Sequence, residues 1–88
     1  MFLEVIKANH LYRNTLALEF NNGEQLSVDL INHLKGSVFS PLKKEEYFKK
    51  FSIKYNTIEW PNGADFAPEF LYELGIQQKE EKEITNRN

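Results

Sequence analysis

Cysteine is absent from this 88-residue chain, and proline and glycine are scarce, at three and four residues. Without cysteine there is no disulfide, no thiolate zinc site and no cysteine nucleophile, and the composition suits a reducing compartment. No apolar run approaches the roughly 18–20 residues that span a bilayer. The segment from Met1 to Lys7 lacks the basic region and long apolar core of a signal peptide. We therefore predict a cytoplasmic protein.

A strong excess of one charge is also lacking, because the formal net charge is −2. A general binder of polyanions is not expected from such a balance. The four glycines are scattered and form no phosphate-binding loop, and no serine lies in a GxSxG sequence. We predict that the protein is not an enzyme and uses no cofactor.

Hydrophobic residues are abundant, at 41% of the chain, and they include seven Phe, four Tyr and one Trp. A chain of this length forms one domain, and such a domain buries only about 60% of its extended-chain surface. Large aromatic side chains allow a few residues to bury a large area. We predict a single α+β domain over residues 1–75.

Two segments alternate apolar and polar residues, which places each apolar set on one face of a strand. The two apolar sets are Leu16, Leu18, Phe20 and Leu26, Val28, Leu30. Asn21-Asn22-Gly23 lies between them, and Asn-Gly predicts a type I′ turn. A first strand is expected over residues 3–9, followed by a polar connection over residues 9–14.

The second half of the chain predicts a helix, a second hairpin and another helix. Residues 31–37 suggest a short turn, after which Ser40 suits an N-cap and Pro41 the first position of a helix containing Tyr47 and Phe48. The second hairpin turns near Tyr55-Asn56, and Asn62-Gly63 makes a further turn. The last helix begins at Pro68 and ends at Gly75. Residues 76–88 have few apolar groups and are predicted to be a disordered charged tail.

The predicted order is βββ-α-ββ-α. It corresponds to a small, mostly antiparallel sheet with two short helices packed on one face.

Few residues suggest site chemistry. His10 and His33 are the two histidines, and a catalytic zinc site would require a third ligand such as Asp29. We therefore interpret both histidines as solvated loop residues and predict no metal site. Glu59 and Asp65 flank Trp60 and suggest an acid–base pair. The alternative, which we favour, places Glu59 in solvent and Asp65 near the N-terminus of the last helix, where a carboxylate is stabilising.

Trp60 has two interpretations. Tryptophan is enriched at binding hot spots, so Trp60 is a candidate partner-binding residue. As the one tryptophan in a small domain, it also suits a core position that fixes the last helix to the sheet, and we favour the core.

Charge is unevenly distributed along the chain. Residues 35–54 carry six lysines against two glutamates, whereas residues 55–75 carry four acids and no base. One interpretation is a solvated helix face with the i,i+4 pairs Glu45–Lys49 and Glu46–Lys50. The other is a basic patch that meets an acidic partner or nucleic acid phosphates. This patch consists of Lys43, Lys44, Lys49 and Lys50.

Several blocks together resemble the bacterial domain-of-unknown-function family 2442 over roughly residues 1–74. They are the hairpin around Asn21-Asn22-Gly23, the segments 39–42 and 48–51, and above all the run from Trp60-Pro61-Asn62-Gly63 through Asp65 to Leu71-Tyr72. The resemblance implies a small bacterial α+β protein. Some relatives are fused to a helix-turn-helix module or encoded beside another small protein, which suggests a toxin–antitoxin-like or adaptor role, and no catalytic residues come with the family.

We therefore expect a non-enzymatic protein-interaction module whose partner is another small protein. A nucleic-acid-binding accessory that uses the lysine-rich first helix is the alternative. Self-association into a homo-oligomer is a further alternative, and no membrane partner is expected.

Overall fold

Two antiparallel sheets and a set of helices make up the computed structural model, which describes residues 2–85 and the side chains of residues 2–83. The order of the elements confirms the predicted α+β class and the βββ-α-ββ-α sequence, with the strands divided between two sheets. The strands of the first sheet are β1 (Val5–Tyr12), β2 (Thr15–Phe20) and β3 (Gln25–Asp29), and those of the second are β4 (Ser52–Lys54) and β5 (Thr57–Glu59). The helical elements are η1 (Ile31–His33), η2 (Ser40–Lys43), α1 (Glu45–Phe48) and α2 (Pro68–Thr85).

The β2–β3 hairpin confirms the alternation in the sequence. Leu16 pairs with Val28 and Leu18 with Leu26, and all six apolar residues of the two predicted sets are buried. Because side chains alternate across a strand, this register turns one face of the sheet toward the core and the other toward solvent.

The turn of this hairpin differs from the predicted type I′ turn. Gly23 N–H donates to the carbonyl of Phe20 at 3.0 Å, and Phe20 N–H donates to the carbonyl of Glu24 at 2.9 Å. Gly23 has a φ of +90°, whereas Asn22 does not have a positive φ. The loop is therefore a type I turn followed by a left-handed glycine, which is the common three-residue hairpin loop.

The same loop recurs at Trp60–Ala64, where the predicted Asn62-Gly63 turn is confirmed. Gly63 N–H donates to the carbonyl of Trp60, and Trp60 N–H donates to that of Ala64, both at 2.9 Å. In each loop the asparagine side chain accepts the N–H two residues later, as Asn62 Oδ1 does from Ala64 at 3.1 Å. The conformation with two successive positive φ angles instead occurs in the β4–β5 hairpin, at the predicted Tyr55-Asn56 turn.

Strand β1 is longer than predicted, since residues 9–12 continue it instead of forming a polar connection. The outward positions of an antiparallel strand with one solvated face accept polar residues such as Lys7 and Asn9. The chain reverses only at Arg13 and Asn14, and Arg13 takes a left-handed φ of +47°.

The predicted first helix is divided into two short pieces. Lys44 separates η2 from α1, because its backbone is extended, with φ −81° and ψ 123°. Ser40 does not act as a side-chain cap; the residue preceding η2 is Phe39. The two pieces place Leu42 and Phe48 in the core, a placement that a continuous helix from Ser40 would not give.

The last helix passes through Gly75, so its predicted end there is wrong. A Cβ at Gly75 would lie 2.9 Å from the Cβ of Leu26, and Gly75 therefore permits close contact between α2 and β3. Residues 76–85 continue the helix, contrary to the predicted disordered tail, and residues 86–88 lie outside the described part. Their Gln, Lys and Glu residues are good helix formers, and extending a docked helix avoids the cost of nucleation.

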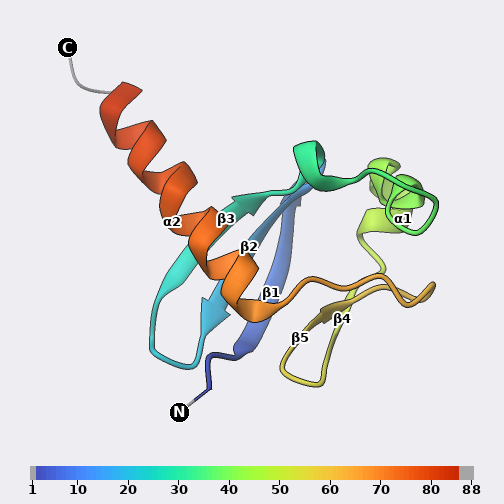
Figure 1. Ribbon diagram of the computed structural model, residues 1–88, viewed down its shortest axis with the longest axis horizontal. Coiled ribbons are helices and arrows are strands. Elements are labelled where there is room, and N and C mark those ends of the chain that lie inside the picture. Colours follow the sequence, from blue (N-terminus) through green and yellow to red (C-terminus); the bar gives the residue numbers. More distant parts are fainter. Residues whose placement is uncertain (1, 86–88) are drawn as a thin grey trace.

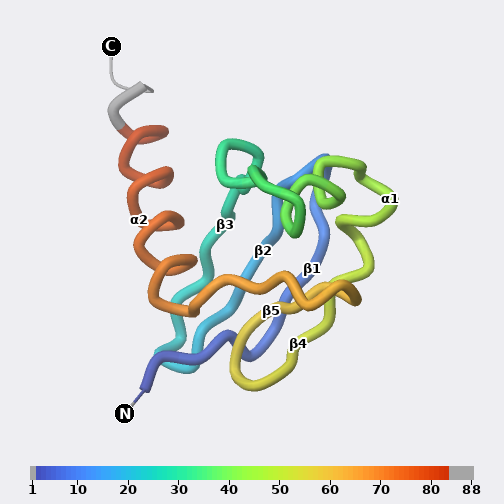
Figure 2. The backbone as a smooth tube through the Cα atoms, turned by 45° about the vertical axis from the view of Figure 1, so that its right-hand side comes forward, coloured from blue at the N-terminus to red at the C-terminus, as the bar shows by residue number. Residues whose placement is uncertain are grey.

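The two α-helices lie on the same side of the three-stranded sheet, as predicted, and share one core with it (Figures 1 and 2). Helix α2 packs across β3, while η2 and α1 lie at the far end near the β1–β2 turn. The C-terminal half of α2 extends beyond β3 in both views. Among residues 2–85, no helix has the length and apolar character required to cross a membrane.

Candidate functional site

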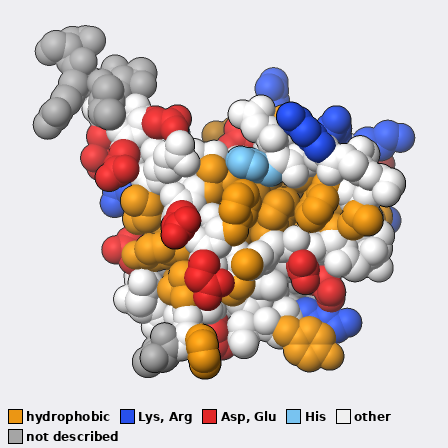
Figure 3. All heavy atoms as spheres, viewed as in Figure 1, with side chains coloured by type: hydrophobic (Ala, Val, Ile, Leu, Met, Phe, Trp, Pro, Cys, Tyr) orange, Lys and Arg blue, Asp and Glu red, His pale blue; other side chains and the backbone are white. Residues whose placement is uncertain are grey.

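The four predicted lysines lie together around α1. Lys43 ends η2, Lys44 precedes α1, and Lys49 and Lys50 follow it. All four are exposed, and blue side chains gather where α1 lies, at the upper right of Figure 3. This lysine patch is the strongest accumulation of positive charge on the face shown.

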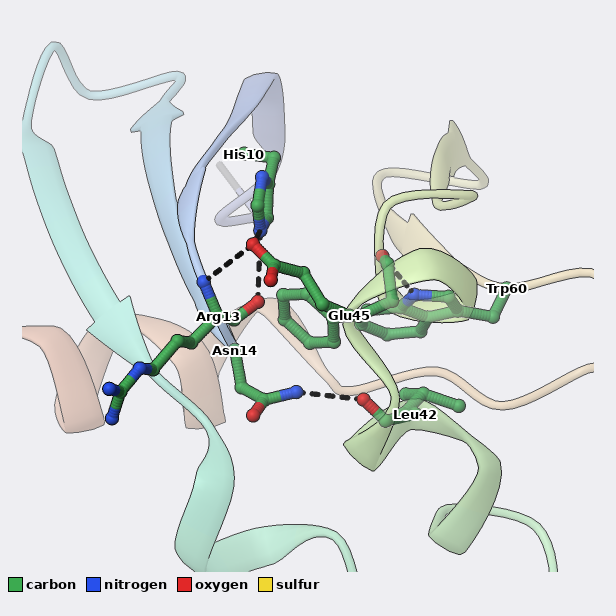
Figure 4. A network of polar contacts seen from close by, with 7 residues as sticks. His10, Arg13, Asn14, Leu42, Glu45 and Trp60 are labelled. Carbon is green, nitrogen blue, oxygen red and sulfur yellow. Dashed lines mark hydrogen bonds and ion pairs between the residues drawn. The ribbon is translucent and has the colours of Figure 1, made fainter.

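The glutamates beside this patch do not neutralise it in the predicted way. Among residues 2–83, Lys54 and Glu59 form an ion pair with an N–O separation of 3.6 Å, and His10 Nε2 lies 3.6 Å from a carboxylate oxygen of Glu45. The Glu45 carboxylate instead accepts the backbone N–H of Arg13 at 3.0 Å (Figure 4). The predicted Glu45–Lys49 and Glu46–Lys50 pairs are therefore absent from this part of the chain.

Glu45 belongs to a network that holds the β1–β2 turn against η2 and α1 (Figure 4). His10 Nε2 lies 2.9 Å from the carbonyl oxygen of Arg13, so the tautomer with a proton on Nε2 donates this bond. The buried Asn14 side chain donates to the carbonyl of Leu42 at 2.8 Å. Because these contacts fix backbone groups, we assign the network a structural role.

The histidines do not come together. His10 lies on β1, not in the predicted loop, and its ring contacts Phe48 at a centroid distance of 6.0 Å. His33 contacts Phe70 at 5.1 Å. In the described part of the chain, no three His, Asp or Glu side chains are arranged to hold a metal ion.

Trp60 is a core residue, as we favoured, and its burial argues against a role in partner binding. Its side chain is 2% exposed, and its Nε1–H donates to the carbonyl of Phe48 at 2.8 Å. Phe48, Phe51 and Phe66 surround the indole at centroid distances of 5.4, 6.4 and 6.0 Å. A partner has no access to the ring in this conformation.

Glu59 and Asp65 do not form an acid–base pair. Their backbones form an antiparallel bridge, while the Glu59 carboxylate faces Lys54. Asp65 lies before α2, which begins at Pro68. Among the described residues, its carboxylate makes no hydrogen bond to the N-terminus of α2, contrary to the prediction.

A row of aromatic rings, which the sequence analysis did not identify, runs from the core to the surface. The rings of His33, Phe70, Phe66 and Phe39 contact one another in that order, with centroids 5.1, 5.6 and 4.9 Å apart. We call this row the aromatic ladder. Phe66 and Phe70 stack within 13° of parallel. Phe66 lies just before α2 and Phe70 in its first turn, and this spacing of four residues is the one feature of the sequence that indicates the stacking.

The ladder is partly exposed between two kinds of charge. Phe70 is 38% exposed, and Val38, which precedes Phe39 in the chain, is 47% exposed. In Figure 3, hydrophobic side chains gather in the middle of the face, with acidic side chains to the left and below and basic side chains at the upper right. An apolar area with charged borders is typical of a protein-binding surface.

The comparison with known proteins identifies the family. The family described as "Protein of unknown function (DUF2442)" matches residues 5–77, which include every strand and most of α2. No curated protein and no solved structure gives a significant match. The chain therefore belongs to the DUF2442 family, as its Trp60-Pro61-Asn62-Gly63 block and the elements around it predict.

Proposed function

We propose that this chain is a non-enzymatic protein-interaction module that binds another protein through the aromatic ladder. The observation that carries the proposal is the exposure of Phe70, whose ring stacks on that of Phe66. Rigid aromatic side chains supply contact area at a low cost in conformational entropy, and they dominate many binding hot spots.

The charges around the ladder indicate the chemistry of the partner. An apolar centre on the partner would cover Phe70, and an acidic region would face the lysine patch. Such complementarity accelerates encounter more than it increases affinity. A basic region would face the acids of α2, such as Glu69 and Glu73.

The resemblance stated above supports the biological setting of the proposal. A small bacterial protein of the cytoplasm that acts as an antitoxin-like or adaptor partner requires a binding surface and no catalytic group. The partner in this proposal is another small protein.

Affinity capture from the source cells tests the ladder directly. Wild type, Phe70→Asp and Val38→Asp are compared with Tyr55→Asp, a matched control because Tyr55 is 86% exposed in the β4–β5 turn. A hot-spot loss of about 2 kcal/mol corresponds to roughly a thirtyfold loss of affinity. We expect quantitative mass spectrometry to show a protein that wild type and the control retain and that Phe70→Asp loses, with a smaller loss for Val38→Asp beside the ladder residue Phe39 in the chain. Equal capture by all four proteins contradicts the proposal, provided that each variant melts cooperatively.

A nucleic-acid-binding accessory is the second candidate, and the exposed lysine patch favours it. Four phosphate contacts predict a slope of about −3.6 for log K against log salt on duplex DNA. Titration with duplex DNA and with RNA at several salt concentrations measures this slope. A steep slope that disappears when all four lysines are replaced by glutamate, without capture of a protein, would favour this candidate over the first.

A further inference from the structure

Strand β3 lies at the edge of the first sheet, with β2 on one side. The hydrogen-bond pattern of the β2–β3 ladder determines which backbone groups point outward. The bonds Phe20 N–H to Glu24 and Leu30 N–H to Asn14 bracket this ladder. Bonded and non-bonded pairs alternate in an antiparallel ladder, so the even-numbered residues of β3 bond to β2.

The odd-numbered residues Gln25, Ser27 and Asp29 therefore direct both N–H and C=O away from the sheet. Asp29 shows this directly, because both of its backbone groups bond to Gln78 of α2. Its N–H donates to Oε1, and its carbonyl accepts from Nε2, each at 2.9 Å. A carboxamide has the hydrogen-bonding groups of a peptide, so Gln78 occupies the place of one peptide group of a fourth strand.

Helix α2 crosses β3 on the buried face of the sheet and reaches the outer edge of β3 only at Asp29. Leu71, Gly75, Gln78 and Lys82 follow one another at helical spacing. Leu71 and Gly75 pack in the core, and Gln78 reaches the edge of β3. Beyond this edge, Lys79, Lys82 and Glu81 of α2 line a groove of about 600 Å³ together with Gln25 and Ser27. The overhang of α2 past β3 is visible in Figures 1 and 2.

The opposite edge of the sheet is less accessible. Val5 N–H of β1 donates to the carbonyl of Asn56 at 2.9 Å, and the β4–β5 hairpin lies beside β1. An added strand would meet this hairpin at the β1 edge, whereas at the β3 edge it meets the groove.

We propose that the β3 edge binds an extended peptide segment of a partner protein as a fourth strand, with an acidic side chain facing Lys79 and Lys82. Main-chain bonds to Gln25 and Ser27 supply affinity, and the two lysines select the charge. The neighbouring Asp29 carboxylate accepts the N–H of Ile31 at 3.0 Å. This site is separate from the aromatic ladder, and it adds a second binding surface to the proposed function.

The Gln78 side chain would then compete with the bound peptide for the backbone N–H and C=O of Asp29. A segment long enough to pair with Asp29 must displace the Gln78 carboxamide, whereas a shorter segment pairs with Gln25 and Ser27 alone. Replacing Gln78 should therefore strengthen the binding of long segments selectively.

A library of random seven-residue peptides displayed on phage, selected against the immobilised full chain, provides the probe. We expect enriched peptides to combine β-branched residues with an acidic residue. A synthetic peptide of the enriched sequence is then added to the protein, and amide hydrogen exchange is followed by NMR. The N–H groups of Gln25 and Ser27 should exchange at least tenfold more slowly, because each gains an acceptor.

Variants separate charge selection from general attraction. Lys79→Glu with Lys82→Glu should weaken the probe about tenfold or more, as a close opposite-charge pair becomes a repulsive one. The matched control, Lys49→Glu with Lys50→Glu in the lysine patch, should leave its affinity unchanged. Gln78→Ala should tighten the probe by about two- to tenfold, the effect of roughly one net hydrogen bond.

Several outcomes would overturn the proposal. They are failure to enrich any peptide, unchanged exchange at Gln25 and Ser27, and equal loss of affinity in the two lysine double variants. Protection of both N–H groups on raising the concentration of the protein alone would identify a second copy as the occupant and overturn the proposal. Phe70→Asp should not change the affinity of the probe, so this test and that of the ladder fail independently.

Discussion

Two halves of the core are held together by different kinds of hydrogen bond. In the half formed by β1, β2, β3 and α2, regular backbone ladders align aliphatic side chains such as Leu26 and Val28. In the half around Trp60, short helices and loops surround aromatic rings. Side chains there bond to backbone carbonyls, as Trp60 does to Phe48 and Asn14 does to Leu42.

The difference shows how a short chain stabilises irregular backbone. Loops and single helical turns leave carbonyl groups that no ladder satisfies, and burying such groups without a partner is costly. In the aromatic half, the Trp60 indole donates to the carbonyl of Phe48 and the Asn14 carboxamide donates to that of Leu42. No buried side-chain N or O atom among the described residues lacks a partner. We expect single substitutions to have their largest effects in this half.

Trp60→Ala should cause the largest loss. Removing the ring leaves a cavity between Phe48 and Phe66 and should lower the free energy of unfolding by about 3–5 kcal/mol, enough to unfold a domain of ordinary stability. Thermal or urea unfolding followed by circular dichroism measures the loss. Trp60→Phe retains a ring but not the indole N–H, so it should lose less. An unchanged melting temperature for Trp60→Ala would refute the central role of this residue.

Asn14→Ala should have the next largest effect. It leaves the buried carbonyl of Leu42 without its side-chain donor and should lower the free energy of unfolding by about 1–3 kcal/mol. Asn9→Ala, on the exposed face of β1, is the matched control and should change stability by no more than about 0.5 kcal/mol. Equal urea midpoints for the two variants would show that the Asn14 bond does not stabilise the aromatic half.

Gly75→Ala tests the close contact in the regular half. A Cβ would lie 2.9 Å from both Cβ and Cδ1 of Leu26 and 3.2 Å from Cγ2 of Val28. Overpacking costs about 1–3 kcal/mol, and the higher helix propensity of alanine offsets about 1 kcal/mol. We expect a net loss of about 1 kcal/mol, measured by urea unfolding. Gln77→Ala, at an exposed helical position, is the control, and a more stable Gly75→Ala variant would mean that α2 shifts easily away from β3.

Deleting residues 77–88 should have the smallest effect. The removed segment contributes the Gln78 bonds to Asp29, which lie at the exposed edge of β3. We expect the melting temperature to fall by less than about 4 °C, which corresponds to 1 kcal/mol or less in a domain of this size. Deleting residues 79–88, which keeps Gln78, should have a smaller effect still. A larger fall would show that the overhanging half of α2 stabilises the domain.

The regular half was largely predictable from local patterns. Alternation identified the buried face of β2 and β3, because a strand has a period of two residues whatever it packs against. Asn-Gly located two turns, at Gly23 and Gly63, although not the turn type at Gly23. Gly75 was misinterpreted because a glycine at a helix end and a glycine at a close helix–strand contact look the same in a sequence.

The candidate sites were less predictable. The exposed lysine patch followed from sequence, because residues near one another along the chain stay near one another in space. The aromatic ladder joins rings from residues 33–70, and the β3 site joins Gln25 and Ser27 to Lys79 and Lys82. A local pattern in the sequence does not indicate which residues far apart in the chain lie close together in the fold.

The sequence by itself determined the α+β class, the hairpins, the family and the charge distribution, since each depends on periodicity, turn residues or order along the chain. Tertiary structure decided that Trp60 is buried, that Glu45 bonds to Arg13 and not to a lysine, and that α2 extends past the edge of β3. These features depend on which distant groups meet. A buried donor takes the carbonyl that the fold brings to it, and a helix that is already docked continues without a new nucleation cost.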